Sequence, residues 1–521
     1  MPHPTPIRGA RVALALAAAL WFAASTAHAA PADRMRGRYL GVEGLRLDIA
    51  EEYDLFLRGE AFHPWRAVAW QVISLGIGSA WYWANADLNK QDWDYPGWEA
   101  RLDLSAVRFD DNHFTINHVS HPFSGAAYYA LARVNGMGVI SSAGFSIATS
   151  SVWEFILEWR ELVSLNDSIF TPGAGIPIGE AIYRLAHYVN SAPEGGGWPQ
   201  KIAAATVGFP LWIHRWFDGR TVPSGPADEL GFSAAYHHRF RLAYLRAAVD
   251  DAVTEKSGLD GFDLRMRLYA IPGFGRPGET EMLFSAGDLV DVSAWATWDE
   301  DGEGAEWVML FETVLAGYYT QKLEGPPEAV SGSAALAGIV VGYEQAQRWR
   351  PEPRDRWSMV HMPGPDGSIW VYWNGFSARL HLVMRPTFNA IDSVATSDWK
   401  LENPDLQLRS VLDRRGYYYG FGLSGRLELE LAYAGASLGG MVRYAYVESF
   451  DGVDRAQEDV QYDEPLDDEM VVYSAWAQYT VPRWLLSARL GFTRTERQGA
   501  IGDLRRERTW HRVEGSVGIE F

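Results

Sequence analysis

Two histidines and several carboxylates give the sequence its densest potential chemistry, between residues 117 and 188. His118 and His121 are separated by two residues, and Glu154 and Asp167 follow further along the chain. A histidine beside a carboxylate can work as a general base with an orienting partner. An HxxH pair on one helix face can also bind a metal ion. These four side chains are therefore the candidate catalytic residues.

The motifs that usually accompany such chemistry are missing. Pro122 directly follows His121, which favours the start of a helix at this point over a helix interior. Neither a G-x-S-x-G nor an HExxH motif occurs near these residues. The sequence thus leaves open whether the chain is an enzyme, and we assign it no metal and no cofactor.

Packing and ion pairing explain the same segment without catalysis, and we favour this interpretation. Buried charges need partners. Arg133 or Arg184 could pair with a glutamate and join two helices; the glutamates available for this are Glu154, Glu158 and Glu180. Asn166 and Asp167 could cap the following helix.

Residues 60–84 and 120–190 are predicted to be mainly helical, whereas the chain beyond about residue 230 shows the period-2 alternation of β-strands. In one run, Phe421, Leu423, Leu427 and Leu429 alternate with Ser424, Arg426, Glu428 and Glu430. The runs are ten to fifteen residues long by pattern, and aromatic residues lie near their ends. Because only a closed sheet satisfies a strand backbone in lipid, we predict a membrane all-β barrel of about twelve antiparallel strands. With an N-terminal α-helical domain the fold is α+β overall, and a soluble periplasmic β-domain is the alternative.

Charged residues occupy the polar faces of the predicted strands. If these faces line the lumen, the charges form a network of mixed sign and not a selectivity ring of one sign. We favour a structural ion-pair lining over substrate conduction. The residues concerned are Arg265, Arg379, Arg426, Glu428, Arg443 and Arg489.

Composition and the first residues point to export. The chain has 46 Lys+Arg, 66 Asp+Glu and a formal charge of −20, which argues against nucleic-acid binding. It has no cysteine, and aromatic residues make up 13% of it, including 23 tryptophans, as in proteins of the membrane interface. Residues 1–29 have the layout of a signal peptide. We therefore expect a bacterial outer-membrane location with outer-membrane lipid as a partner.

Two resemblances accompany these expectations. The stretches HPFSGAAYYALARVNG, SSVWEFILEW and SLNDSIFTPGAGIPIGEAIYRL resemble the bacterial family called domain of unknown function 3943, over about residues 110–190. Members of this family look like exported outer-membrane proteins, and the resemblance implies no reaction. The last strand, ending on Phe521, resembles the signal read by the barrel-assembly machinery. The family pattern carries over to His118, His121, Pro122, Gly125, Tyr128, Arg133, Glu154, Asn166, Asp167, Gly179, Glu180 and Arg184.

The predicted organisation is a signal peptide at 1–29, a mainly helical domain at 30–210 and an outer-membrane barrel at 211–521. The first functional hypothesis is a structural or transport-associated barrel, which the helices plug or cap. The alternative is a barrel-embedded enzyme that hydrolyses envelope lipid or glycan with His118, His121, Glu154 and Asp167. A soluble periplasmic binding module is a third hypothesis. Helices inside the lumen would indicate a plug, whereas helices outside the barrel at its periplasmic end would indicate docking or catalysis.

Overall fold

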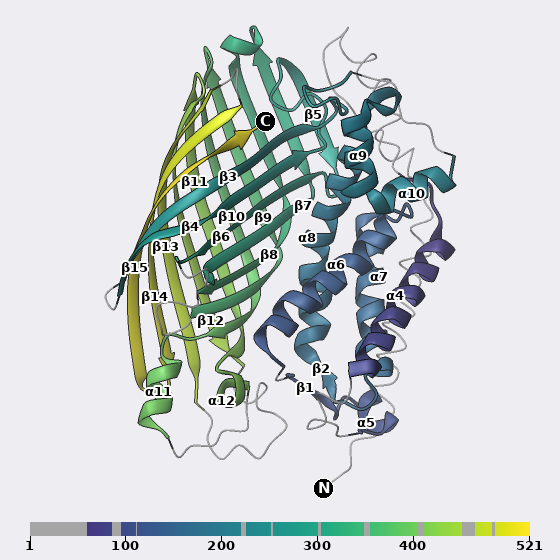
Figure 1. Cartoon of the computed structure of the whole chain (residues 1–521), viewed down its shortest axis with the longest axis vertical. Helices are drawn as coiled ribbons and strands as arrows, with labels where there is room; N and C mark the ends of the chain where they lie inside the picture. Colours follow the sequence, from purple (N-terminus) through teal and green to yellow (C-terminus); the bar gives the residue numbers. More distant parts are fainter. Residues whose placement is uncertain are drawn as a thin grey trace.

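The computed structural model places a set of helices beside a barrel of long strands (Figure 1). The structure describes residues 60–85, 95–110, 112–219, 226–251, 254–300, 304–348, 355–404, 411–450, 464–481 and 485–521. The predicted signal peptide at 1–29 lies outside these residues.

The first half of the described chain is helical. Its two longest helices are α4, which carries almost no charge, and α8, which contains Pro172 and Pro177 and is largely buried. Its elements are α4 (Pro64–Asn85), α5 (Trp98–Leu102), β1 (Val107–Arg108), η2 (Ile116–Ser120), α6 (His121–Arg133), α7 (Val139–Val152), η3 (Trp153–Leu157), β2 (Val163–Ser164), α8 (Leu165–Val189), η4 (Pro193–Gly195), α9 (Trp198–Thr206) and α10 (Phe209–Phe217).

The second half consists of long strands, with helices only in the connections. The elements are β3 (His237–Asp251), β4 (Thr254–Tyr269), β5 (Gly278–Phe284), β6 (Leu289–Trp298), β7 (Gly304–Glu324), η5 (Pro327–Ala329), β8 (Ser331–Arg348), β9 (Asp355–Trp373), β10 (Phe376–Asp392), α11 (Thr396–Glu402), α12 (Val411–Arg415), β11 (Tyr418–Tyr433), β12 (Ala436–Ser449), β13 (Leu466–Val481), β14 (Leu486–Ile501) and β15 (Leu504–Glu520).

These strands close into a ring. All thirteen belong to one antiparallel sheet, in which β15 pairs with β3 and β7 pairs with both β6 and β8. β5 pairs only with β7, along Gly317–Leu323, a part of β7 that is not paired with β6. β5 therefore lies outside the ring, and the other twelve strands form the barrel. The prediction of about twelve antiparallel strands is confirmed.

The two faces of the barrel wall differ in polarity. On β11 the side chains of Phe421, Leu423 and Leu427 are more than 40% exposed on the outer face. The intervening Arg426 and Glu428 line the lumen. Exposed apolar side chains also occur on β3, β4, β10 and β12–β15. A closed barrel with an apolar outer surface and a polar interior is a membrane barrel, as predicted.

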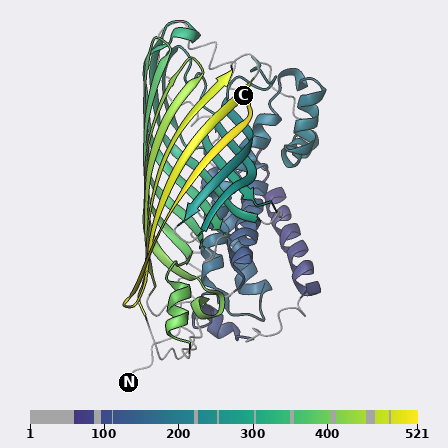
Figure 2. The same ribbon diagram turned by 60° about the vertical axis from the view of Figure 1, so that its left-hand side comes forward.

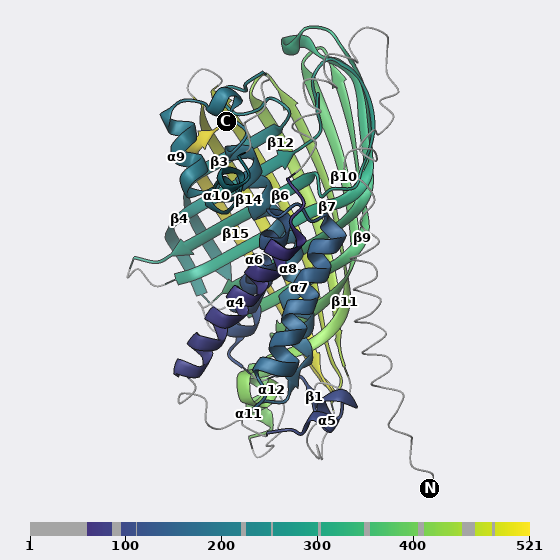
Figure 3. The ribbon, with the colours of Figure 1, turned by 90° about the vertical axis from the view of Figure 1, so that its right-hand side faces the viewer.

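The helices pack against the outside of this wall. Ala174 and Ile178 of α8 lie in one apolar cluster with Tyr343 of β8, and Ala181 lies in another with Phe311 of β7 packed against it. The next residues along these strands, Glu344 and Glu312, face the lumen cavity. The views in Figures 1 and 3 agree, with α8 next to the wall and α4 and α7 farther out. The helices described here therefore form a layer beside the barrel. The prediction that they plug the barrel is wrong.

Glycine allows the two central helices of this layer to approach closely. A Cβ atom on Gly125 of α6 would lie 1.7 Å from the backbone oxygen of Thr171 in α8. A Cβ atom on Gly175 would lie 2.5 Å from the backbone carbon of Gly125. Both distances are far below van der Waals contact, so these two glycines set the spacing of α6 and α8.

The outer face of β11 gives a first prediction. Arginine in place of Leu427, near the middle of the strand, should destabilise the folded barrel by about 2–4 kcal/mol, because a charge at the bilayer midplane is poorly solvated. The control Leu438→Arg is near the start of β12 and should cost about 0–1 kcal/mol. Reversible urea unfolding in lipid vesicles measures both, and equal costs would contradict a membrane-facing surface here.

The helix crossing gives a second prediction. Gly125→Ala should separate α6 from α8 and destabilise the helical layer, because the added methyl group has no space. Gly144→Ala in α7 is the matched control, since a Cβ atom added there would have nothing within 4 Å. Alanine should there be neutral or stabilising by about 0.5–1 kcal/mol. Thermal unfolding followed by helical circular dichroism distinguishes the two variants, and similar behaviour would argue against the close crossing.

Candidate functional site

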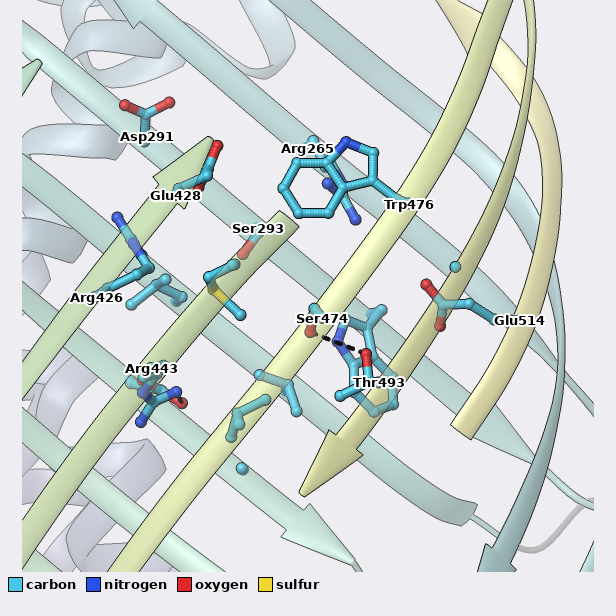
Figure 4. Close-up of a pocket in the computed structure, with 18 of the residues that line it drawn as sticks. Arg265, Asp291, Ser293, Arg426, Glu428, Arg443, Ser474, Trp476, Thr493 and Glu514 are labelled. Carbon is cyan, nitrogen blue, oxygen red and sulfur yellow. Dashed lines mark hydrogen bonds and ion pairs between the residues drawn. The ribbon is translucent and has the colours of Figure 1, made fainter. Parts of the chain in front are cut away.

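Polar side chains converge in two places, the barrel lumen and a cluster within the helical layer. The lumen contains a cavity of about 410 Å³ lined by side chains from strands all around the barrel. Figure 4 shows Arg265, Glu428 and Trp476 directed into this space from different strands. Ser474 and Thr493 share a hydrogen bond of 3.0 Å on its wall.

Most charges that line the cavity have a partner of opposite sign. The carboxylate of Glu312 accepts from Arg385 at 2.5 Å and from Arg426 at 2.6 Å. Glu344 accepts from Arg443, and Arg497 donates to Asp355 at 2.6 Å. The lining is therefore a network of both signs, in which each charge offsets the burial of another.

All six lumen charges selected from the sequence line this cavity. Arg426 and Arg443 have the partners given above. Arg379 lies 3.8 Å from Glu428, and Arg265 donates to Asp263 at 3.2 Å. The guanidinium of Arg489 lies 4.7 Å from the centre of the Trp476 ring, in a cation–π arrangement.

Apolar groups occupy the lumen near its two ends. Near the end that carries the long β10–β11 connection, Trp399 of α11 and Leu412 of α12 are buried against Trp357 and Tyr418. We call Trp399 and Leu412 the stopper. Figure 2 shows α11 at the end of the barrel opposite the C-terminus. Near the other end, Phe274 stacks on Tyr319 with ring centroids 5.0 Å apart, within a further apolar cluster.

The second polar region joins three of the four candidate catalytic residues. One donor atom from each of His121, Glu154 and Asp167 lies within 4.8 Å of the other two. The Nε2 atom of His121 is 3.8 Å from Oδ2 of Asp167. These residues come from α6, η3 and the first turn of α8, so the packing of three helical segments creates the cluster.

Local structure orients this cluster. The hydroxyl of Ser164 accepts from the backbone N–H of Asp167 at 3.2 Å and so caps α8. The parallel pair β1–β2 brings Asp110 alongside, where its backbone N–H donates to Oδ1 of Asn166 at 2.7 Å. The prediction that Asn166 and Asp167 cap this helix is wrong, because both lie within α8 and Ser164 is its N-cap.

Carboxylates accumulate around these residues. Burial, followed by the neighbouring charge of Asp167, raises the pKa of Asp110 to about 8. Burial and the nearby Glu161 hold the pKa of Glu158 well above its usual range. Nearby, the guanidinium of Arg101 donates to main-chain oxygens, among them those of Glu154 and Glu158 at 3.2 and 3.1 Å. Burial and mutual repulsion therefore favour either the protonated form of these carboxyl groups or a cation beside them.

His118 lies apart from this group. Its ring is fully buried among the rings of Phe114, Phe170 and Tyr417, and its Nδ1 atom is 2.8 Å from the carbonyl oxygen of Phe114. Among the described residues, the donor atoms of His121, Glu154 and Asp167 converge, and His118 is not part of that group. The structure therefore separates the proposed HxxH pair.

The remaining motif residues hold the helices together. Glu180 of α8 is fully buried and accepts from Arg133 at 2.7 Å, from Arg184 at 2.8 Å and from the Tyr129 hydroxyl at 2.7 Å. Arg184 also reaches Asp288, between β5 and β6, at 3.2 Å and ties the layer to the barrel. Pro122 is in the first turn of α6, Tyr128 accepts from Gln71 through its backbone oxygen, and Gly179 faces Ala126 and Tyr129.

One known family matches part of the helical layer. A family described as "Domain of unknown function (DUF3943)" matches residues 106–210. This confirms the family resemblance drawn from the three sequence stretches. The matched residues contain the His121 cluster and the Glu180 network, and the barrel follows them. No curated protein matches the chain.

Solved outer-membrane barrels show a distant likeness. The outer membrane protein OpdK from Pseudomonas aeruginosa is 11% identical, with 55% of this chain and 99% of that chain covered and a TM-score of 0.18. OccAB3 from Acinetobacter baumannii is 9% identical, with 55% and 99% covered and a TM-score of 0.19. A Pseudomonas aeruginosa FadL homologue is 8% identical, with 56% and 91% covered and a TM-score of 0.18. Because these similarities are weak, we assign the barrel fold from the strand pairing within this chain.

Sequence reasoning missed several partners. Asp110 precedes the motif directly, in the run FDDNHF, and its acidic character was the only signal of its role. Ser164 is the N-cap of α8, whereas the sequence pointed to Asn166 and Asp167 for this role. Asp288 and Glu312 lie far along the chain from Arg184 and Arg426, respectively, and only strand register and helix docking bring these pairs together.

The Glu180 network gives a third prediction. Glu180→Gln should destabilise the protein by about 3–5 kcal/mol, because Arg133 and Arg184 lose the buried carboxylate that they share. Glu99→Gln, at an exposed position, is the control and should change stability little. Denaturant unfolding measures both, and a variant as stable as the parent would show that Glu180 does not fasten α6 to α8.

Proposed function

We propose that the protein is an outer-membrane barrel that holds a small polar solute in its lumen and passes it across the membrane when the stopper moves. The observation that carries this proposal is the lumen cavity of about 410 Å³ with its lining of both charge signs. That volume lies in the range of small-molecule sites. A solute with both a cationic and an anionic group would match the lining.

The asymmetry of the two barrel ends supports the outer-membrane assignment. At one end two connections are tight turns, since β9 ends at Trp373 and β10 starts at Phe376, while β11 ends at Tyr433 and β12 starts at Ala436. At the other end the β10–β11 connection contains two helices. Short periplasmic turns and long extracellular loops are typical of outer-membrane barrels. The stopper would then lie on the extracellular side.

The outer surfaces of the barrel and the helical layer support outer-membrane lipid as the partner. α4 exposes Trp65, Val72, Ile77 and Trp81. Val139–Leu157 is long and apolar enough to cross a membrane by length and composition, with about a third of it buried. We infer that lipid covers the helical layer as it covers the free part of the wall. The same proposal includes recognition of β15 and the adjacent Phe521 by the barrel-assembly machinery.

The stopper is held by apolar packing inside the lumen and by weaker contacts outside. Arg506 of β15 binds Asp398 and, at 3.2 Å, Glu402 of α11, and these groups are largely exposed. Exposed ion pairs contribute little stability, about 0–1 kcal/mol. Burial of Trp399 in the stopper is therefore the main contribution that keeps this end closed.

The stopper gives a fourth prediction. Trp399→Ala should remove about 3–5 kcal/mol of packing. At about 1.4 kcal/mol per tenfold, this raises the open fraction about 100-fold or more. Conductance in planar bilayers, and solute uptake into vesicles, should increase accordingly. The control Leu401→Ala changes an exposed residue of the same helix and should leave conductance unchanged.

The same measurement tests the proposed function. If Trp399→Ala folds as a barrel but conducts no more than the parent, the lumen is a sealed ion-paired core and the protein has a structural role. Folding is checked independently by the shift in gel mobility between heated and unheated samples.

A further inference from the structure

We propose that His121, Glu154 and Asp167 bind a first-row divalent transition-metal ion, for which Zn²⁺ is the representative probe. The site lies in the helical layer outside the barrel wall, so it does not depend on the proposed transport through the lumen. It would be a mixed nitrogen and oxygen site with three protein ligands.

The spacing of the donor atoms suits a shared ion. Nε2 of His121 and Oδ2 of Asp167 are 3.8 Å apart, which is too long for a hydrogen bond. Two ligands that each lie about 2.1 Å from one zinc ion are about 3.4 Å apart at the tetrahedral angle. The donor atoms of all three residues lie within 4.8 Å of one another. A small contraction would bring them to bonding distance around an ion.

Glu154 supplies the independent observation that an ion is needed here. Its side chain is 1% exposed, and its Oε1 atom has no hydrogen-bond partner. Its other oxygen accepts from the backbone N–H of Ser164 at 3.3 Å. A buried carboxylate oxygen without a partner carries a large desolvation cost. A bound cation between Glu154, His121 and Asp167 would remove that cost.

Neighbouring groups hold the ligands in place, as they do around known metal sites. Asn166 donates to Oδ1 of Asp167 at 3.0 Å, which leaves Oδ2 directed at His121. The hydroxyl of Thr171 lies 3.5 Å from Nδ1 of His121. With that nitrogen turned toward Thr171, Nε2 is the atom available to a metal.

The donor set indicates the class of metal. Imidazole nitrogen favours zinc, iron and nickel, whereas carboxylate oxygens alone favour magnesium, calcium and manganese. One nitrogen with two carboxylates therefore selects zinc, iron or manganese over magnesium and calcium. Three protein ligands would leave a coordination position for water or another ligand, as in catalytic zinc sites.

Metal content and thermal stability of the full-length protein test the proposal. The detergent-solubilised chain is stripped with a chelator and then titrated with Zn²⁺, Mn²⁺ or Mg²⁺. We expect one high-affinity Zn²⁺ per chain by elemental analysis. Zn²⁺ should also raise the thermal midpoint, because a ligand that binds only the folded state stabilises it. Mg²⁺ should give neither effect at the same concentration.

Isosteric variants assign the ion to this site. Glu154→Gln and Asp167→Asn should lose the bound Zn²⁺ and its thermal shift. Asn166 is not a proposed ligand but donates to Asp167, so Asn166→Ala should weaken affinity about 10- to 100-fold. Asp103→Asn, an exposed carboxylate outside the cluster, is the control and should bind as the parent does.

Two outcomes would overturn the proposal. One is a parent chain that binds no Zn²⁺ and shows no thermal shift. The other is a set of folded variants that bind Zn²⁺ as tightly as the parent, which would place the ion elsewhere. If one variant fails to fold, the Zn²⁺ titration of the parent chain still tests binding, and the other isosteric variant still tests the location of the ion.

Discussion

The structure depends on the pairing of every backbone N–H and C=O group in a wall that faces lipid. A sheet with free edges leaves such groups unpaired, and hydrocarbon offers them no partner. β7 removes the edges by pairing with β6 on one side and β8 on the other. Closure by hydrogen bonds also holds the barrel together in a chain that has no cysteine.

Closure divides the side chains between two environments. Alternate residues face outward and need an apolar covering, and over β6–β9 the helical layer provides it in place of lipid. Several residues of the family motif hold that layer together and to the barrel. Glu180 pairs with Arg133 and Arg184, and Arg184 also pairs with Asp288. What the motif retains for chemistry is the cluster of His121, Glu154 and Asp167.

The lumen shows the other consequence of closure. Charges that a flat sheet would present to water are brought face to face across the barrel, as Glu312 is with Arg385 and Arg426. Their pairing leaves a cavity between apolar groups near both ends. The apolar group near one end includes Trp399 and Leu412, which both belong to the β10–β11 connection.

The sequence by itself determined the membrane barrel, its approximate strand number and the family of the helical segment, because period-2 alternation and short motifs are local properties. It also selected three residues that converge, His121, Glu154 and Asp167. It did not determine that His118 would lie in an aromatic pocket or that the helices would pack outside the wall. Those features depend on contacts between distant residues, such as Asp110 with Asn166 and Tyr343 with His118. Only the tertiary structure decides which of many possible distant pairs form, since local patterns carry no information about their partners.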